Sequence, residues 1–129
     1  MLQTHPYELV QVPPGARWSI VGIVLENGRR PTMDFLDRSA TDAEEFFALS
    51  GLLLKGEPFQ QYGSRFKRLR NVSNVFQIAA RRERYLGFRW RAAHLVMTNA
   101  FPKQSNSTPP SEIGLCTRLQ QQFFEQYGS

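Results

Sequence analysis

Residues 75–101 read VFQIAARRERYLGFRWRAAHLVMTNAF. Three runs rich in β-branched, aromatic and other apolar residues follow one another in this stretch, and they predict strands near residues 75–82, 85–91 and 94–101. The connections between the runs are too short for a crossover helix, so neighbouring strands are expected to pair in antiparallel fashion. Arginines alternate with the apolar residues, which predicts a sheet with a core on one face and a cationic surface on the other.

Further elements are predicted before and after this stretch. Residues 18–25 form a largely buried first strand, closed by a turn at Asn27-Gly28, and residues 66–69 pair at a sheet edge. Pro31 opens a short helix that turns Met33, Phe35 and Leu36 inward.

Two longer helices complete the prediction. The first has the spacing of a capping box, with Thr41 as N-cap and Glu44 at the third helical position. Its expected apolar stripe is Ala43, Phe46, Phe47, Ser50, Leu53 and Leu54. The second begins at Pro109 and Pro110, with a stripe of Ile113, Cys116, Leu119, Phe123 and Phe124. The order of elements predicts one α+β domain over residues 1–129, with residues 1–15 as an irregular lead.

The charge is distributed unevenly along the chain. Sixteen Lys and Arg against eleven Asp and Glu leave a formal net charge of +5. Nine of the bases fall within residues 65–91, where Glu83 is the only acid, whereas acids gather in residues 34–45. Such a patch predicts an anionic partner, with nucleic acid foremost, and the alternative is a solvated surface.

Several classes of protein are excluded or disfavoured by composition. The single cysteine, Cys116, rules out an internal disulfide and is expected to be buried, and no Cys/His cluster has the spacing of a zinc site. We therefore expect no metal and no other cofactor. Residues 1–14 have neither a basic start nor an apolar core, so we expect no signal peptide. No run of about eighteen apolar residues occurs, so we expect a cytoplasmic protein without a membrane partner.

Several short motifs occur in an order that resembles a known family. They are Pro31, Phe35-Leu36-Asp37, Phe66-Lys67-Arg68-Leu69, Val75-Phe76-Gln77-Ile78, Arg84, and a tail of Phe101, Lys103, Thr108-Pro109 and Glu112-Ile113. Together they resemble the RelE/ParE superfamily of toxins from bacterial and phage type II toxin–antitoxin modules, most closely its HigB-like, phage-derived branch. The resemblance covers most of the chain, and the tail is its strongest part.

The resemblance implies a fold, an activity and partners. The expected fold is a small curved antiparallel sheet packed against two N-terminal helices and a C-terminal helix. The expected activity is ribosome-dependent cleavage of messenger RNA without a metal, in which the ribose 2′-hydroxyl attacks the neighbouring phosphate. The protein must then align the backbone, neutralise developing charge and help to move protons. The expected partners are the ribosome, messenger RNA and an antitoxin that has a helix-turn-helix domain and an acidic segment.

The family's functional residues carry over only in part. Lys67, Arg84 and Lys103 match basic positions of the family and are the expected catalytic residues. Ala79, Gln104 and Asn99 replace an arginine, a lysine and a histidine, respectively. Arg81 is expected to compensate for Ala79, because it is two residues further along the same strand. The remaining bases of the patch are expected to bind RNA: Arg65, Arg68, Arg70, Arg82, Arg89 and Arg91.

The missing groups leave two alternatives to the enzyme. One is a catalytically weakened module that binds RNA or the antitoxin, and the other is a ParE-like gyrase inhibitor that cleaves nothing. His94 is interpreted as an edge residue rather than an acid–base group. Phe88 and Trp90 are interpreted as core, and Tyr85 is left open between core packing and base stacking.

Overall fold

Four strands follow one another as an antiparallel meander in the computed structural model, which describes residues 7–8, 19–38, 40–54, 65–91 and 94–129. They are β3 (Phe66–Arg68), β4 (Val75–Ala80), β5 (Glu83–Trp90) and β6 (His94–Pro102). Each pairs with the next, and β3 lies at the sheet edge. The predicted meander is therefore confirmed, with shorter bounds for β4 because the chain turns at Arg81 and Arg82.

The sheet as a whole is mixed rather than antiparallel. β1 (Tyr7–Glu8) pairs antiparallel with β2 (Ser19–Gly22), and β2 lies parallel to β6, with Ser19 opposite His94. The six strands lie in the order β1-β2-β6-β5-β4-β3. The expectation of a purely antiparallel sheet is wrong at the β2–β6 pair, because loop length constrains only consecutive strands and β2 finds its partner far along the chain. β1 also places a strand within the lead that was expected to be irregular, and Trp18 lies outside the described residues.

Three helices complete an α+β fold: α1 (Pro31–Asp37), α2 (Ala40–Leu54) and α3 (Pro110–Tyr127). Proline occupies the first helical position of α1 and of α3, where its fixed φ suits the helix and no backbone N–H is lost from the ladder. α2 begins at Ala40, so Thr41 is its second residue and the predicted capping box is wrong. None of the described helices is long and apolar enough to cross a membrane.

Most of the predicted inward positions of the helices are confirmed. The buried ones include Leu36, Ala43, Phe46, Ser50, Cys116, Leu119 and Phe123, while Met33, Phe35, Ile113 and Phe124 are partly buried. Phe47 is an exception, because its exposed fraction is 38 % and Leu49 takes the inner position instead. The side chains of Leu53 and Leu54 lie outside the described part of the structure.

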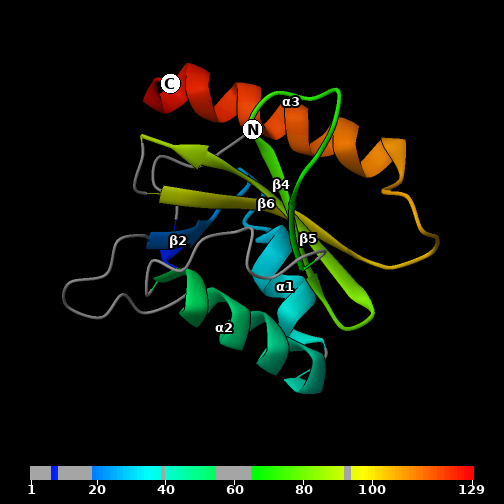
Figure 1. Cartoon of the computed structure of the whole chain (residues 1–129). Helices are drawn as coiled ribbons and strands as arrows, with labels where there is room; N and C mark the ends of the chain where they lie inside the picture. The colour runs from blue at the N-terminus through cyan, green and yellow to red at the C-terminus, as the bar shows by residue number, and fades with distance from the viewer. Residues whose placement is uncertain (1–6, 9–18, 39, 55–64, 92–93) are drawn as a thin grey trace.

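Helices cover both faces of the sheet (Figure 1). α1 and α2 pack on one face against a cluster that contains Ile78 and Tyr85, and α3 packs on the other against Phe88 and Val96. The Tyr85 ring is fully buried, with its centroid 4.4 Å from that of Phe46. Tyr85 is thus a core residue. The prediction of one open cationic face is wrong, because side chains on both faces of β5 are buried, Tyr85 under α2 and Phe88 under α3.

The end of α3 is fixed to the sheet by its last residues. Trp90 Nε1 donates a hydrogen bond of 2.9 Å to the carbonyl of Gly128, and the Arg91 guanidinium donates one of 2.8 Å to the carbonyl of Tyr127. The Trp90 ring also lies edge-on to Phe123, with 5.0 Å between centroids. These contacts hold the carboxyl end of α3 against the end of β5.

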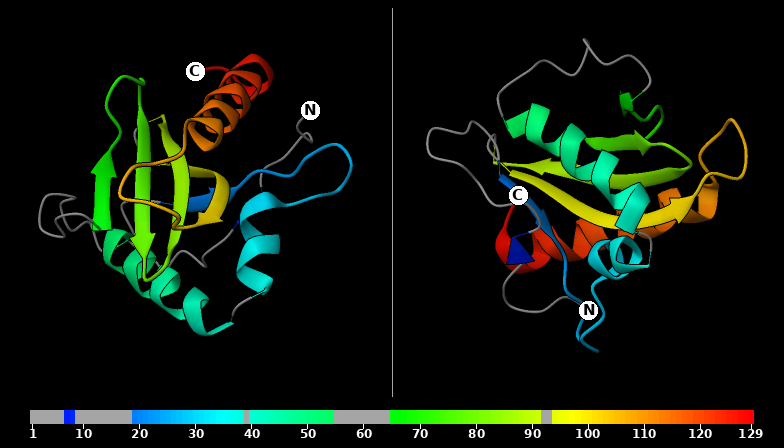
Figure 2. Two further views of the ribbon diagram at one scale, coloured as in Figure 1. Left: turned by 90° about the vertical axis from the view of Figure 1, so that its right-hand side faces the viewer. Right: turned by 90° about the horizontal axis from the view of Figure 1, so that it is seen from below.

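A β-bulge bends the centre of the sheet. The register between β5 and β6 shifts between Leu86 and Gly87, so that Leu86 faces Asn99, Gly87 faces Met97, and Thr98 is the extra residue. Gly87 lies so close to β6 that a Cβ atom there would be 2.5 Å from the carbonyl oxygen of Val96. Figure 2 shows the resulting twist and curvature of the strands.

We expect Gly87→Ala to lower the free energy of unfolding by about 1–3 kcal/mol, because the added methyl group must push the β6 backbone away. The matched control is Gly114→Ala in α3, where a Cβ atom meets nothing within 4 Å. The control should raise stability by about 0.5–1 kcal/mol, since alanine loses less backbone entropy in a helix. Urea unfolding of the two variants measures both effects, and equal midpoints for wild type and Gly87→Ala would contradict the prediction.

Candidate functional site

A cleft of about 190 Å³ opens on the α3 side of the sheet, beyond the start of that helix. Its floor is built from β3, β4 and β5, and the chain that connects β6 to α3 forms its wall. Figure 2 shows that connection, in orange, arching out past the end of the sheet. The lining residues are Lys67, Gln77, Ala79, Arg84, Phe101, Lys103, Gln104, Ser105, Asn106, Ser107, Thr108 and Pro109.

Strand register explains why these floor residues meet. Lys67 lies opposite Gln77 across β3 and β4, and Arg84 of β5 lies opposite both Ala79 and Phe101. Gln77 and Ala79 share a face because they are two residues apart in one strand. α3 covers that face further along, where Leu86 and Cys116 belong to one apolar cluster.

Three cations from separate parts of the chain converge on the cleft: Lys67 of β3, Arg84 of β5 and Lys103 just after β6. Within the described part of the chain, none of the three has a carboxylate oxygen within 4.0 Å. Their mutual repulsion is therefore uncompensated by described acids, and the cleft favours an anionic ligand. The three expected catalytic residues thus lie at one site.

The Arg84 side chain is held in place by the neighbouring hairpin turn. Its Nη1 donates hydrogen bonds to the carbonyl oxygens of Arg81, at 2.9 Å, and Glu83, at 2.8 Å. Arg81 has a φ of 55°, which turns the chain sharply after β4 and presents its carbonyl to the guanidinium. With Nη1 bound, the other guanidinium nitrogens stay available to a ligand in the cleft.

The wall of the cleft is tied to the floor at two points. The backbone N–H of Lys103 donates to the carbonyl of Arg82 at 2.7 Å, and Thr108 Oγ1 donates to Gln77 Oε1 at 2.6 Å. Beyond the wall, Asn99 Nδ2 donates to Glu112 Oε1 at 2.9 Å and fixes the first turn of α3 to β6. The cleft is therefore braced by hydrogen bonds on both sides of the connection.

The three positions at which this sequence departs from the resembled family lie partly in the cleft and partly in the core. Ala79 and Gln104 line the cleft, where the resembled family has bases, whereas Asn99 is buried and serves the contact with α3. Arg81 does not line the cleft beside Ala79. Its guanidinium approaches Glu45 of α2 at 3.8 Å, because the strand ends at Ala80 and the turn interrupts the alternation that the prediction assumed.

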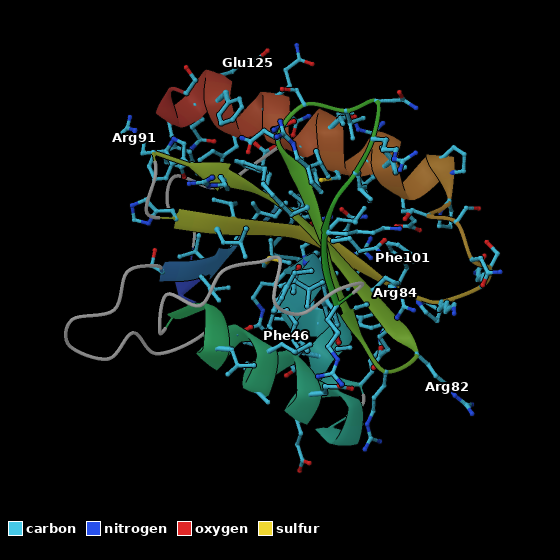
Figure 3. All side chains as sticks on the ribbon, viewed as in Figure 1. Phe46, Arg82, Arg84, Arg91, Phe101 and Glu125 are labelled. Atoms are coloured by element: carbon cyan, nitrogen blue, oxygen red, sulfur yellow. The ribbon has the colours of Figure 1, made fainter. Side chains whose placement is uncertain are left out.

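The other bases do not line the cleft. Arg82 is exposed in the hairpin turn beside Lys103, and Arg65, Arg68 and Arg70 are exposed just before, at the end of and just after β3. Arg89 and Arg91 lie at the opposite end of β5, about 20 Å from Arg84 by strand rise. Figure 3 shows Arg84 and Arg91 at these two ends. The Arg91 guanidinium stacks on the Trp90 ring at 4.4 Å, so its first role is structural.

Two residues that could carry nucleophilic or acid–base chemistry are structural instead. Burial raises the pKa of the Cys116 thiol to about 11, only partly opposed by its hydrogen bond with Thr98, so the thiol is neutral at physiological pH. His94 is half-buried at the start of β6, where its Nδ1 is hydrogen bonded with Ser19 Oγ and its ring packs on Trp90. Neither residue lines the cleft.

The chemistry of the cleft is that of an anion site rather than a metal site. Its described lining includes no carboxylate, imidazole or thiol, and no group of three His, Cys, Asp or Glu suited to a metal occurs in the described ranges. Lysine and arginine donors can bind phosphate oxygens and neutralise charge that develops on them.

No protein-family model matches the sequence, and a search of curated proteins finds no relative of it. The residues of the cleft are therefore the basis on which a function is proposed.

Gln77 and the hydroxyl-rich wall that contains Ser105, Ser107 and Thr108 were not predicted to line a functional site. A signal for Gln77 was present, because it is two residues before Ala79 and shares its strand face. For the wall, the tail motif contained Thr108, but nothing in the sequence indicated that this loop folds back over β4 to reach Gln77.

We expect the stability of the protein to fall between pH 9 and about pH 11, by up to about 3 kcal/mol from Cys116. The pKa of this thiol is about 11 in the folded state against an ordinary value of 9.0. Between these two values the thiol is protonated when the protein is folded and ionised when it is unfolded, so rising pH favours unfolding. Unfolding measured at pH 8, 9, 10 and 11 tests this, with Cys116→Ala as the control for other titrating groups. Parallel pH profiles for the two proteins would contradict it.

Proposed function

We propose that the protein is a RelE-like endoribonuclease, the toxin of a type II toxin–antitoxin module, which cleaves ribosome-bound messenger RNA without a metal. The observation that carries this proposal is the convergence of Lys67, Arg84 and Lys103 on one cleft free of described carboxylates. A phosphodiester in this cleft would receive charge-assisted hydrogen bonds from three directions.

The proposed reaction is a transesterification within the RNA. The 2′-hydroxyl gives its proton to water as its oxygen attacks the adjacent phosphorus. The bond to the 5′-oxygen breaks as that oxygen takes up a proton, and the products end in a 2′,3′-cyclic phosphate and a 5′-hydroxyl. Arg84 has the role of stabilising charge on the non-bridging oxygens, since its guanidinium is already held by the hairpin turn. Lys67 and Lys103 are the groups on the lining that can give a proton to the leaving 5′-oxygen.

A second candidate function is a binding module with a weakened active site. Ala79 and Gln104 line the same cleft and supply neither charge nor a proton, which favours this candidate. The cleft would then hold RNA, or an acidic segment of the antitoxin, without cleaving anything.

We expect Arg84→Ala to lower the single-turnover rate of messenger cleavage about a hundredfold or more, by analogy with the loss of one oxyanion donor. Ribosome affinity should change far less, because the lost interaction acts mainly on charge that develops in the transition state. The assay uses purified protein and a ribosome-bound message, with chelator present. The matched control is Arg118→Ala, an exposed arginine on α3 outside the cleft, which should keep the wild-type rate.

The same assay separates the two candidates. A wild-type protein that binds the programmed ribosome but yields no 2′,3′-cyclic phosphate end would refute the enzyme and leave the binding module.

We further expect an acidic antitoxin segment to cover the cleft cations and block RNA. Charge complementarity of this kind raises the association rate and the salt dependence of binding. A Lys67→Ala/Arg84→Ala variant should therefore bind a Glu/Asp-rich antitoxin peptide more weakly and with a shallower salt slope than Arg118→Ala does. Identical slopes, measured by titration at several salt concentrations, would show that the segment docks elsewhere.

A further inference from the structure

Gln77 occupies an unusual position for a neutral polar side chain. It lies near the middle of β4 with an exposed fraction of only 5 %, yet it lines the cleft between Lys67 and Arg84. Glutamine is mostly found at protein surfaces, so its burial here calls for hydrogen-bond partners at both ends of the amide.

Within the residues that the structure describes, one end of the amide has such a partner and the other does not. Gln77 Oε1 accepts a hydrogen bond from Thr108 Oγ1 at 2.6 Å, which fixes the side chain between the floor and the wall. Among the described residues, none accepts a hydrogen bond from Nε2. Nε2 is not among the buried polar atoms that lack a partner, so it is open to the space of the cleft. The amide therefore presents a preorganised donor there, and a ligand can replace water as its partner.

The surroundings of Nε2 define the partner that it suits. Lys67 is the register neighbour of Gln77 across β3, and Lys103 and Arg84 line the same space, so the charged neighbours are all donors. Ala79, the next residue on this face, has a small side chain that leaves room above the floor. A group that only accepts hydrogen bonds fits such a place, and the non-bridging oxygens of a phosphate are that group.

We propose that Gln77 is a substrate-binding residue whose Nε2 donates to a non-bridging oxygen of the phosphate, with Thr108 as the positioning residue that orients its amide. This inference rests on the proposed function, because it takes the cleft as the phosphodiester site. It adds a neutral donor to the three cations and gives the hydroxyl of Thr108 a defined task.

The competing explanation makes Gln77 only an acceptor that anchors the wall through Thr108. Gln77→Glu keeps an acceptor for Thr108 and replaces the Nε2 donor with an acceptor. Its added charge alone repels phosphate, so the side-chain NH₂ resonances of Gln77 in the wild type are the readout that separates the two roles. Thr108→Val makes the opposite change, since it removes the anchor and leaves the amide donor.

The experiment titrates inorganic phosphate, and then an uncleavable 2′-deoxy oligonucleotide, into ¹⁵N-labelled wild type and variants. We expect the side-chain NH₂ resonances of Gln77 to shift with phosphate in the wild type. Gln77→Glu should weaken phosphate binding at least tenfold, since a charge-assisted hydrogen bond is lost and a repulsion is added. Thr108→Val should weaken it less than Gln77→Glu does.

Three outcomes would overturn the inference: a wild type that binds no phosphate in the cleft, Gln77 resonances that stay fixed while those of the cleft backbone shift, or Gln77→Glu that is well folded and binds phosphate as the wild type does. If Gln77→Glu does not fold, the wild-type resonances alone decide. Phosphate binding that depends on Gln77, in a protein that never cleaves RNA, would refute the proposed enzyme while supporting this inference.

Discussion

β5 has a hydrogen-bonded neighbour along each edge and a helical layer on each face, and this enclosure determines where polar chemistry can occur. Tyr85 fills one face while Leu86 and Phe88 fill the other, and all three are fully buried. Charged side chains are therefore expelled to the two ends of the strand, since an unpaired charge in either core would be very costly. Arg84 at one end and Arg91 at the other are the results of the same constraint.

The parts of the fold that depend on local rules could be predicted from the sequence. The meander of β3 to β6 follows from strand patterning and short loops, and the prolines at the starts of α1 and α3 mark where those helices begin. The parallel pairing of β2 with β6 could not be predicted in this way, because the two strands lie far apart in the sequence and meet through packing on both faces of the sheet. Helical periodicity also predicted wrongly that Phe47 is buried. Phe47 lies at the edge of the apolar stripe of α2, and a small rotation of the helix about its axis, set by tertiary packing, decides which edge is buried.

The site shows the same division. Lys67, Arg84 and Lys103 were predicted from the resemblance, and the register of the meander explains why they line one cleft. Arg81 does not share the cleft with Ala79, because side chains alternate between the faces only while a strand continues. β4 ends at Ala80, and Arg81, with a φ of 55°, already belongs to the turn. The density of basic residues along the sequence also did not show which of them share one surface. The run of bases in residues 65–91 places Lys67 and Arg84 on the cleft and packs Arg91 on Trp90 at the other end of β5.

The docking of the last turn of α3 gives the molecule an internal optical reporter. Trp90 is one of two tryptophans in the chain, and its indole N–H is bound to the Gly128 carbonyl while its ring packs on Phe123. Release of the carboxyl end of the helix would expose this indole to water and break its hydrogen bond at once. Because α3 starts at the wall of the cleft and ends at Trp90, the fluorescence of this residue reports from a distance on the element that frames the site.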